Sequence, residues 1–270
     1  MSFDRMQRIE KLLDQVEKPA RYLGGEMNAV QRQAQEGDLR FAFCFPDTYE
    51  VAMSHLGMKI LYDILNNHPH TLCERVMLPW VDMLEGLRRE QVPLFSLENR
   101  TPLHDFDVVG FTLQYEMSFT NILEMLDLGG IALKSQDRPE DAPIVVAGGP
   151  CAFNPEPMAI FIDAFMLGDG ETVILEVCDL IRNLRAKGSP REEILFQLSQ
   201  IPGVYVPRFY QASYHEDGRL QSFVPIREGV PATVTKRIEL DLENAPYPEK
   251  IPVPYTQVVH DRIVLEIMRG

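Results

Sequence analysis

Four polar or glycine-rich clusters directly follow apolar stretches of the sequence, and they hold the residues best suited to bind a ligand. Carboxylate, amide and phenol groups can orient a polar ligand, and glycines let a ligand approach the backbone. The free N–H groups at the start of a following helix favour negative charge. The candidate binding residues are Pro46, Asp47, Thr48 and Tyr49, then Gln114, Tyr115 and Glu116, then Gly148, Gly149 and Pro150, and finally Gly168, Asp169, Gly170 and Glu171.

The polar candidates also have structural interpretations. Asp47 and Glu50 suit the start of a helix, where the helix dipole stabilises negative charge. The Gln-Tyr-Glu triplet at 114–116 is not needed for packing, which favours a functional role. Cys151 could act as a nucleophile, but no histidine lies near it in the sequence. We therefore assign no catalytic residue in this chain.

The cysteine spacing argues against a metal centre. The chain has four cysteines with no CxxC pair and no close pairing with histidine, so neither a zinc site nor an internal iron–sulfur cluster is expected. Reduced, partly buried thiols are the simpler interpretation. These residues are Cys44, Cys73, Cys151 and Cys178.

The elements that must position the glycine clusters lie between residues 144 and 176. The run 144–147 is apolar and β-branched, as in a strand buried on both faces, and glycines stop it. The run 163–167 repeats this pattern. Asp169 suits the N-cap of a helix that begins near Thr172. Two strands therefore end side by side in glycine turns, at the edge where open α/β sheets bind ligands.

The rest of the central region repeats the alternation of strand and helix. This pattern predicts a doubly wound parallel sheet of five strands with right-handed crossovers. The other predicted strands are 39–45, 71–78 and 106–113, with a short extended piece at 93–97, and the other predicted helices begin near Val51, Trp80 and Phe119 and cover 173–187 and 192–199.

Both ends of the chain lack this alternation of strand and helix patterns. Helical spacing predicts an amphipathic helix over 6–16, followed by either an ordered arm or a plain surface linker at 19–26. Eight of the 20 prolines lie after residue 201. The pattern there predicts antiparallel strands at 204–210, 211–215 and 220–224. We expect three regions: a helix and arm at 1–37, an α/β domain at 38–200, and a β-hairpin and Pro-rich connector at 201–270.

Composition excludes several classes of protein. A chain of 270 residues with 45% hydrophobic residues can bury a sizeable core. Its net charge of -14 argues against general nucleic-acid binding, which needs clustered Lys and Arg. The N-terminus has no apolar signal region, and no stretch approaches roughly 18 apolar residues. We expect a cytoplasmic protein that is not bound to a membrane.

Five segments resemble, in order, the N-terminal part of an uncharacterised family of radical S-adenosylmethionine (SAM) proteins with a cobalamin-binding type of domain. The segments are KPARYLGGE (18–26), FPDTYEVAMSHLG (45–57), GFTLQYEMSFTN (110–121), AGGPCAFNPEP (147–157) and GDGE (168–171). The resemblance implies a flavodoxin-like, Rossmann-like sheet. The end of the chain, 261–270, is similar to the first barrel strand of such proteins, which leads into a CxxxCxxC loop that holds a 4Fe-4S cluster.

The resemblance makes cobalamin a candidate ligand. Domains that use a histidine as lower cobalt ligand carry Asp-x-His-x-x-Gly, but around His55 the matching positions are Met53 and Met58. His55 is better explained as a residue that caps or packs against its own helix. Related proteins bind cobalamin without this ligand and pass its nucleotide tail over the glycine turns, here Gly148, Gly149, Gly168 and Gly170. Loss of cobalamin binding is the alternative.

Three function classes follow from these observations. The first is an accessory domain of a radical SAM enzyme that binds cobalamin or substrate, with the 4Fe-4S cluster, SAM and the catalytic barrel in the part that follows. The second is a stand-alone flavodoxin-like domain that binds a small molecule, and the third is a protein-interaction module. The segment 262–268 is apolar on both faces, as expected of a strand covered on both sides by a sheet or barrel, which favours the first class.

Overall fold

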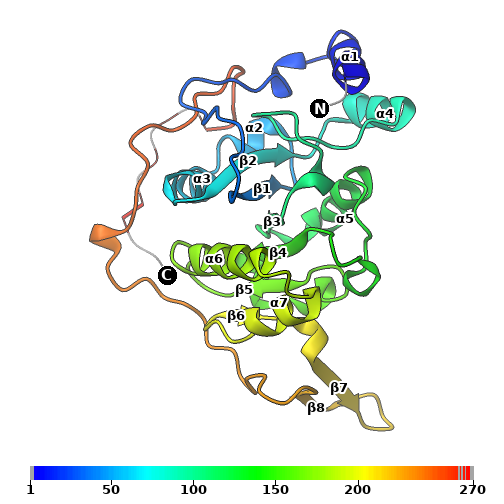
Figure 1. Ribbon diagram of the computed structural model, residues 1–270, viewed down its shortest axis with the longest axis vertical. Coiled ribbons are helices and arrows are strands. Elements are labelled where there is room, and N and C mark those ends of the chain that lie inside the picture. Colours follow the sequence, from blue (N-terminus) through cyan, green and yellow to red (C-terminus); the bar gives the residue numbers. More distant parts are fainter. Residues whose placement is uncertain (1–2, 261, 263, 265, 268–270) are drawn as a thin grey trace.

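A six-stranded sheet forms the centre of the structure, a computed structural model that describes residues 3–260, 262, 264 and 266–267 (Figure 1). The strand order is β2-β1-β3-β4-β5-β6, so the order reverses between β1 and β3. The strands are β1 (Leu39–Phe45), β2 (Thr71–Met77), β3 (Val108–Thr112), β4 (Ile144–Gly148), β5 (Ala164–Met166) and β6 (Val204–Tyr205).

The predicted parallel sheet is confirmed, with one addition. Strands β1 to β5 are parallel and almost entirely buried, which explains their continuous apolar sequences. Strand β6 runs antiparallel to β5 at the sheet edge. The predicted strand at 204–210 is wrong for residues 206–209, because Pro207 starts a 3-10 turn, and Tyr210 belongs to the next strand. The piece at 93–97 is not a strand of this sheet; it forms an isolated bridge from Phe95 to Pro102 and donates the N–H of Leu97 to the carbonyl of Arg75.

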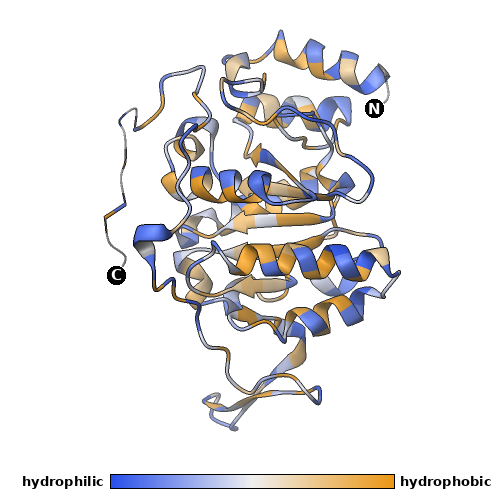
Figure 2. Cartoon of the chain, turned by 60° about the vertical axis from the view of Figure 1, so that its left-hand side comes forward, coloured by the Kyte–Doolittle hydropathy of each residue, from blue (hydrophilic) through white to orange (hydrophobic). Residues whose placement is uncertain are grey.

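Helices cover both faces of the sheet and enclose two separate apolar cores. Figure 2 shows apolar strands between helices that have one apolar and one polar side. One core contains residues of α3 (Leu56–Asn67), α6 (Val173–Ala186) and α7 (Arg191–Leu198). The other contains residues of α1 (Phe3–Leu13), α4 (Val81–Glu90) and α5 (Phe119–Leu128). None of the helices in the described part of the chain is long and apolar enough to span a membrane.

Two predicted helix starts need comment. The helix expected from Val51 is split into α2 (Tyr49–Ala52) and α3, because His55 is extended and caps α3 with its ring nitrogen. This capping role of His55 is confirmed. Helix α6 begins near Thr172 as expected, but Asp169 is not its N-cap. The Asp169 carboxylate instead accepts the backbone N–H of Glu239 at 2.6 Å.

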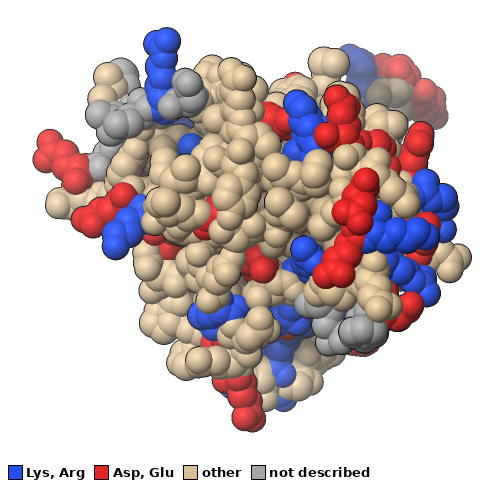
Figure 3. Space-filling view, turned by 90° about the horizontal axis from the view of Figure 1, so that it is seen from above, with Lys and Arg blue, Asp and Glu red and all other residues tan. Residues whose placement is uncertain are grey.

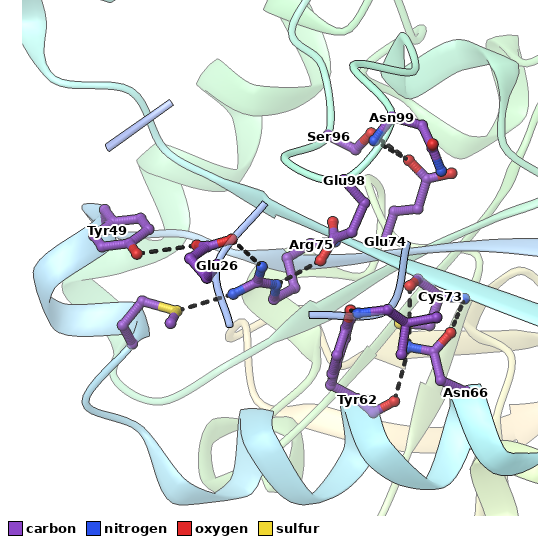
Figure 4. Close-up of polar contacts among 12 residues, drawn as sticks. Glu26, Tyr49, Tyr62, Asn66, Cys73, Glu74, Arg75, Ser96, Glu98 and Asn99 are labelled. Atoms are coloured by element: carbon purple, nitrogen blue, oxygen red, sulfur yellow. Dashed lines mark hydrogen bonds and ion pairs between the residues drawn. The ribbon is translucent and has the colours of Figure 1, made fainter. Parts of the chain in front are cut away.

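Side chains protect the free edge of β2. The amide of Asn66 both accepts from the N–H of Cys73 and donates to its carbonyl, each at 3.1 Å. Glu98 accepts the backbone N–H of Arg75 at 2.7 Å (Figure 4). An exposed strand edge invites pairing with another chain. Together with a backbone bond from Leu97 N–H to the carbonyl of Arg75 at 2.9 Å, these side-chain bonds pair groups of the edge without a further strand.

The chain after β6 first forms the predicted hairpin of β7 (Tyr210–Tyr214) and β8 (Leu220–Pro225), then returns along the domain (Figure 1). On this path it passes beside the N-terminal arm, where Val253 N–H donates to the carbonyl of Met27 at 2.9 Å. The arm is ordered, since Arg21 and Glu26 are buried. Of the predicted terminal strand, residues 262, 264, 266 and 267 have no strand assignment, and the other positions lie outside the described residues.

Candidate functional site

A cavity of about 1020 Å³ opens at the carboxyl edge of the sheet. The ends of β3, β4 and β5 form its floor, while the first turns of α3 and α6 form two walls. Its surface is mainly apolar, with aromatic side chains that include Phe41, Phe43 and Phe111. This is the position at which doubly wound sheets bind ligands.

Eight of the candidate residues line this cavity. Every candidate in the two glycine turns after β4 and β5 lines the cavity, and the triplet at 114–116 contributes its first residue. The lining candidates are Gln114, Gly148, Gly149, Pro150, Gly168, Asp169, Gly170 and Glu171.

The other candidates lie outside the cavity lining. These residues are Pro46, Asp47, Thr48, Tyr49, Tyr115 and Glu116. The hydroxyl of Tyr115 donates to the Asp47 carboxylate at 2.9 Å, which joins the loops after β1 and β3. Tyr49 is buried and donates to Glu26 at 3.0 Å. Burial, and then the nearby Glu26 carboxylate, raise the pKa of Tyr49, so this phenol stays neutral.

One wall of the cavity carries a chain of polar side chains. His55 Nδ1 accepts the N–H of Met58 at 3.1 Å, so a neutral ring carries its proton on Nε2. Burial lowers the pKa of His55 although a hydrogen bond with Gln114 opposes this effect. Gln114 in turn donates to the hydroxyl of Thr112. The cavity therefore presents a neutral, ordered polar wall.

The glycines of the two turns have different structural roles. Gly149 and Gly168 have φ of 107° and 96°, and a Cβ at either would collide with backbone atoms of Leu113 or Arg237. Gly148 and Gly170 lack positive φ, and an added Cβ there would meet only ordinary contacts, 3.6 Å from Met166 and 3.5 Å from Leu61. The first pair shapes the backbone, whereas the second pair leaves space in the cavity.

Sequence reasoning missed several lining residues. Gly110 lies inside β3, where nothing in the sequence distinguishes it from a strand residue that packs in the core. His55 was assigned only as a helix cap, yet it also faces the cavity. Residues 236–239 come from the connector, and no local pattern indicates that they return to the sheet edge. The described tail residues Glu266 and Ile267 also line the cavity.

A buried polar cluster lies beside α2, away from the cavity lining (Figure 4). The fully buried guanidinium of Arg75 contacts Glu98 at 2.6 Å and Glu26 at 2.8 Å. Tyr49 links Glu26 to the connector, because its hydroxyl accepts the N–H of Tyr255 at 3.3 Å. The cluster thus ties the arm, strand β2 and the connector together.

The described residues contain no group of three or more His, Cys, Asp or Glu that could hold a metal ion. Cys44, Cys73 and Cys178 are buried, and burial raises the pKa of each thiol. Cys151 is partly exposed, but burial and Glu116 raise its pKa. A protonated thiol is a poor nucleophile, so Cys151 does not have the surroundings of an activated cysteine.

The charged surface fits the acidic composition. On the face seen in Figure 3, Lys and Arg lie among Asp and Glu, with wide uncharged areas between them. Several basic residues in the described part of the chain form ion pairs, such as Arg88 with Glu124 at 2.7 Å. The described basic residues on this face do not gather into a continuous positive patch (Figure 3).

Comparisons with known proteins place the chain. It is 27% identical over 139 residues to an uncharacterized protein of Methanocaldococcus jannaschii, a stretch that covers 50% of this chain and 26% of that relative. The matched region thus spans about a quarter of the relative's length. A solved structure of the radical SAM methyltransferase TsrM from Kitasatospora setae, with cobalamin and a 4Fe-4S cluster bound, is also similar. The alignment covers 70% of this chain and 31% of the TsrM chain, with 18% sequence identity and a TM-score of 0.39. The family model described as the N-terminal part of radical SAM proteins matches residues 57–207, more than half of the chain, and the chain therefore belongs to this family.

Proposed function

We propose that this chain is an accessory domain of a radical SAM iron–sulfur enzyme, that it binds a cofactor or substrate at the carboxyl edge of its sheet, and that it does not catalyse the reaction alone. The cavity of about 1020 Å³ carries this proposal, because it joins both glycine turns to an ordered polar wall. Membership in a family of N-terminal regions supports the accessory role. The 4Fe-4S cluster, SAM and the catalytic barrel would belong to the following part of the protein, which is also the domain's main partner.

Cobalamin is our candidate for the ligand. Its nucleotide tail would lie along the glycine turns, with Gly148 and Gly170 leaving room for it. When bound, cobalamin would supply a reactive cobalt centre. His55 does not fit the role of lower cobalt ligand, because its Nδ1 accepts the Met58 N–H and its ring is hydrogen-bonded to Gln114. The domain would therefore hold cobalamin by its tail and periphery alone.

Titration of the protein with hydroxocobalamin, followed by its visible spectrum, tests this function. We expect binding at or below tens of micromolar, on the order of 6–7 kcal/mol. A Gly149→Val variant is unsuitable because the φ of Gly149 and the nearby backbone make misfolding the expected result. Gly170→Val is the better variant, since its side chain would enter the cavity without backbone strain.

We expect Gly170→Val to weaken binding about tenfold or more, because overfilling a packed site typically costs about 1–3 kcal/mol. Ala186→Val is the matched control, since Ala186 is exposed at the other end of α6. Lack of binding by the unaltered protein at tens of micromolar would exclude cobalamin. Equal binding by Gly170→Val and the control would exclude this cavity as the site.

A further inference from the structure

The connector contributes one wall of the cavity through residues 236–239. Gly168 and Arg237 form a parallel bridge at the tip of β5. Arg237 N–H donates to the carbonyl of Leu167 at 2.8 Å, and Asp169 N–H donates to the carbonyl of Arg237 at 3.1 Å. The Asp169 carboxylate accepts from Glu239 N–H at 2.6 Å. Through these bonds, a short segment of the connector pairs with the chain at the end of β5, although the two are some seventy residues apart in the sequence.

The side chain of Arg237 anchors this segment to α6. Its two terminal nitrogens lie 2.6 and 3.3 Å from the two carboxylate oxygens of Glu176, and one of them donates to the Thr172 hydroxyl at 3.1 Å. Its aliphatic part passes over Gly203, where a Cβ would collide with it. A two-point contact between arginine and a carboxylate fixes orientation as well as distance. Both the aliphatic part and the guanidinium of Arg237 are therefore held in place.

The residues beside Arg237 face the cavity. Lys236, Ile238 and Glu239 all line it, and the Lys236 ammonium lies 5.8 Å from the centre of the Phe153 ring, which also lines it. Lys236 and Phe153 come from the connector and from the turn after β4, so their contact joins two sides of the cavity. The position of this wall depends on how Arg237 is held.

We propose that Arg237 is a positioning residue for the ligand site, and that its bond to Glu176 holds 236–239 in place as the cavity wall. The identity of the ligand rests on the proposed function, whereas the geometry of the wall does not depend on it. Residues 236–239 lie outside the part matched by the family model, 57–207, so the family region alone does not supply this wall. A partly exposed ion pair contributes little to overall stability. Its loss should therefore change the site more than the fold.

Hydrogen–deuterium exchange on the whole chain tests the geometry without any ligand. We expect Arg237→Gln and Glu176→Gln each to speed exchange at the amides of Asp169 and Glu239 about tenfold, with little change in Tm. The charge-swapped double variant, Arg237→Glu with Glu176→Arg, should restore slow exchange. Arg182→Gln is the control, because Arg182 makes a similar partly exposed pair with Asp179 on the same helix. It should change nothing.

Two further readouts connect the wall to the site. Diethyl pyrocarbonate should modify His55, which lines the cavity, several-fold faster in Arg237→Gln, while exposed His70 and His215 react at unchanged rates. Hydroxocobalamin affinity should fall about tenfold and recover in the charge-swapped variant. Unchanged exchange and unchanged His55 labelling in Arg237→Gln would overturn the proposal. If the unaltered protein fails to bind hydroxocobalamin, the cobalamin assignment fails, and exchange and labelling still decide the role of Arg237.

Discussion

At the scale of single residues, the loss of Arg75 should be strongly destabilising. It is buried between Glu26 and Glu98, so its removal leaves two carboxylates without a counter-charge. Breaking a buried ion pair from one side typically costs about 3–5 kcal/mol. We expect Arg75→Ala to lower the free energy of unfolding by that amount in urea. The control Arg88→Ala removes an exposed ion pair with Glu124 and should lower the free energy of unfolding by about 1 kcal/mol or less. Equal losses of unfolding free energy in the two variants would contradict this account.

Glu98 and Glu50 should give stability opposite dependences on pH. Burial raises the pKa of Glu98 above its ordinary 4.5 even though Arg75 opposes it. The folded state then binds more protons at Glu98, so the stability that wild type has over Glu98→Gln should shrink as pH rises above about 4.5.

Burial also acts to raise the pKa of Glu50, but the hydrogen bond from Arg21 and other contacts lower it overall. Against Glu50→Gln, the wild-type advantage should instead shrink as pH falls below about 4.5. Urea unfolding across this range measures both differences, and parallel trends would refute the assignment.

At the scale of elements, one side chain of α3 protects the part of the β2 edge at Cys73. Asn66 satisfies both backbone groups of Cys73, and Ala at this position would leave them without partners. An unsatisfied buried polar group costs about 1–3 kcal/mol, so Asn66→Ala should lose about that much stability. The neighbouring Asn67 is exposed and donates to Asp63 on the protein surface, so Asn67→Ala should stay within about 0.5 kcal/mol. Denaturant unfolding of the two variants compares them directly, and similar losses would mean that the edge bonds contribute little.

The elements were predictable where local pattern determines them. Continuous apolar runs such as 144–147 indicated the five parallel strands, because such strands are buried on both faces. The glycine turns were predictable for the same reason, since they end those runs. Strand β6 was not separable from the residues after it, because its two residues pair with β5 only through the tertiary fold. The same applies to Asp169, whose sequence suits a helix cap but whose carboxylate bonds to a residue some seventy positions away.

At the scale of the whole molecule, the candidate site combines parts of the chain with very different predictability. Its floor follows from the strand order, which places the ends of β3, β4 and β5 together. The wall formed by 236–239 follows instead from the return path of the connector, which is set here by long-range bonds such as those of Arg237 with Leu167 and Glu239 with Asp169. A Pro-rich sequence indicates an extended chain but not its direction. Long-range contacts of this kind cannot be read from local spacing.

The last prediction concerns iron. A 4Fe-4S cluster in a radical SAM protein needs three cysteine thiolates close together, but three of the cysteines here are buried with raised pKa and only Cys151 is partly exposed. Binding a cluster with these thiols would require opening both apolar cores, at a cost comparable to the whole stability of a domain, about 5–15 kcal/mol. We therefore expect this chain, after anaerobic reconstitution with iron and sulfide, to keep no stoichiometric iron or labile sulfide and to leave SAM uncleaved. A Cys151→Ser variant is the control for adventitious iron, because it removes the accessible thiol without disturbing the cores. Stable iron at cluster stoichiometry together with SAM cleavage would place the catalytic centre inside this chain and overturn its assignment as an accessory domain.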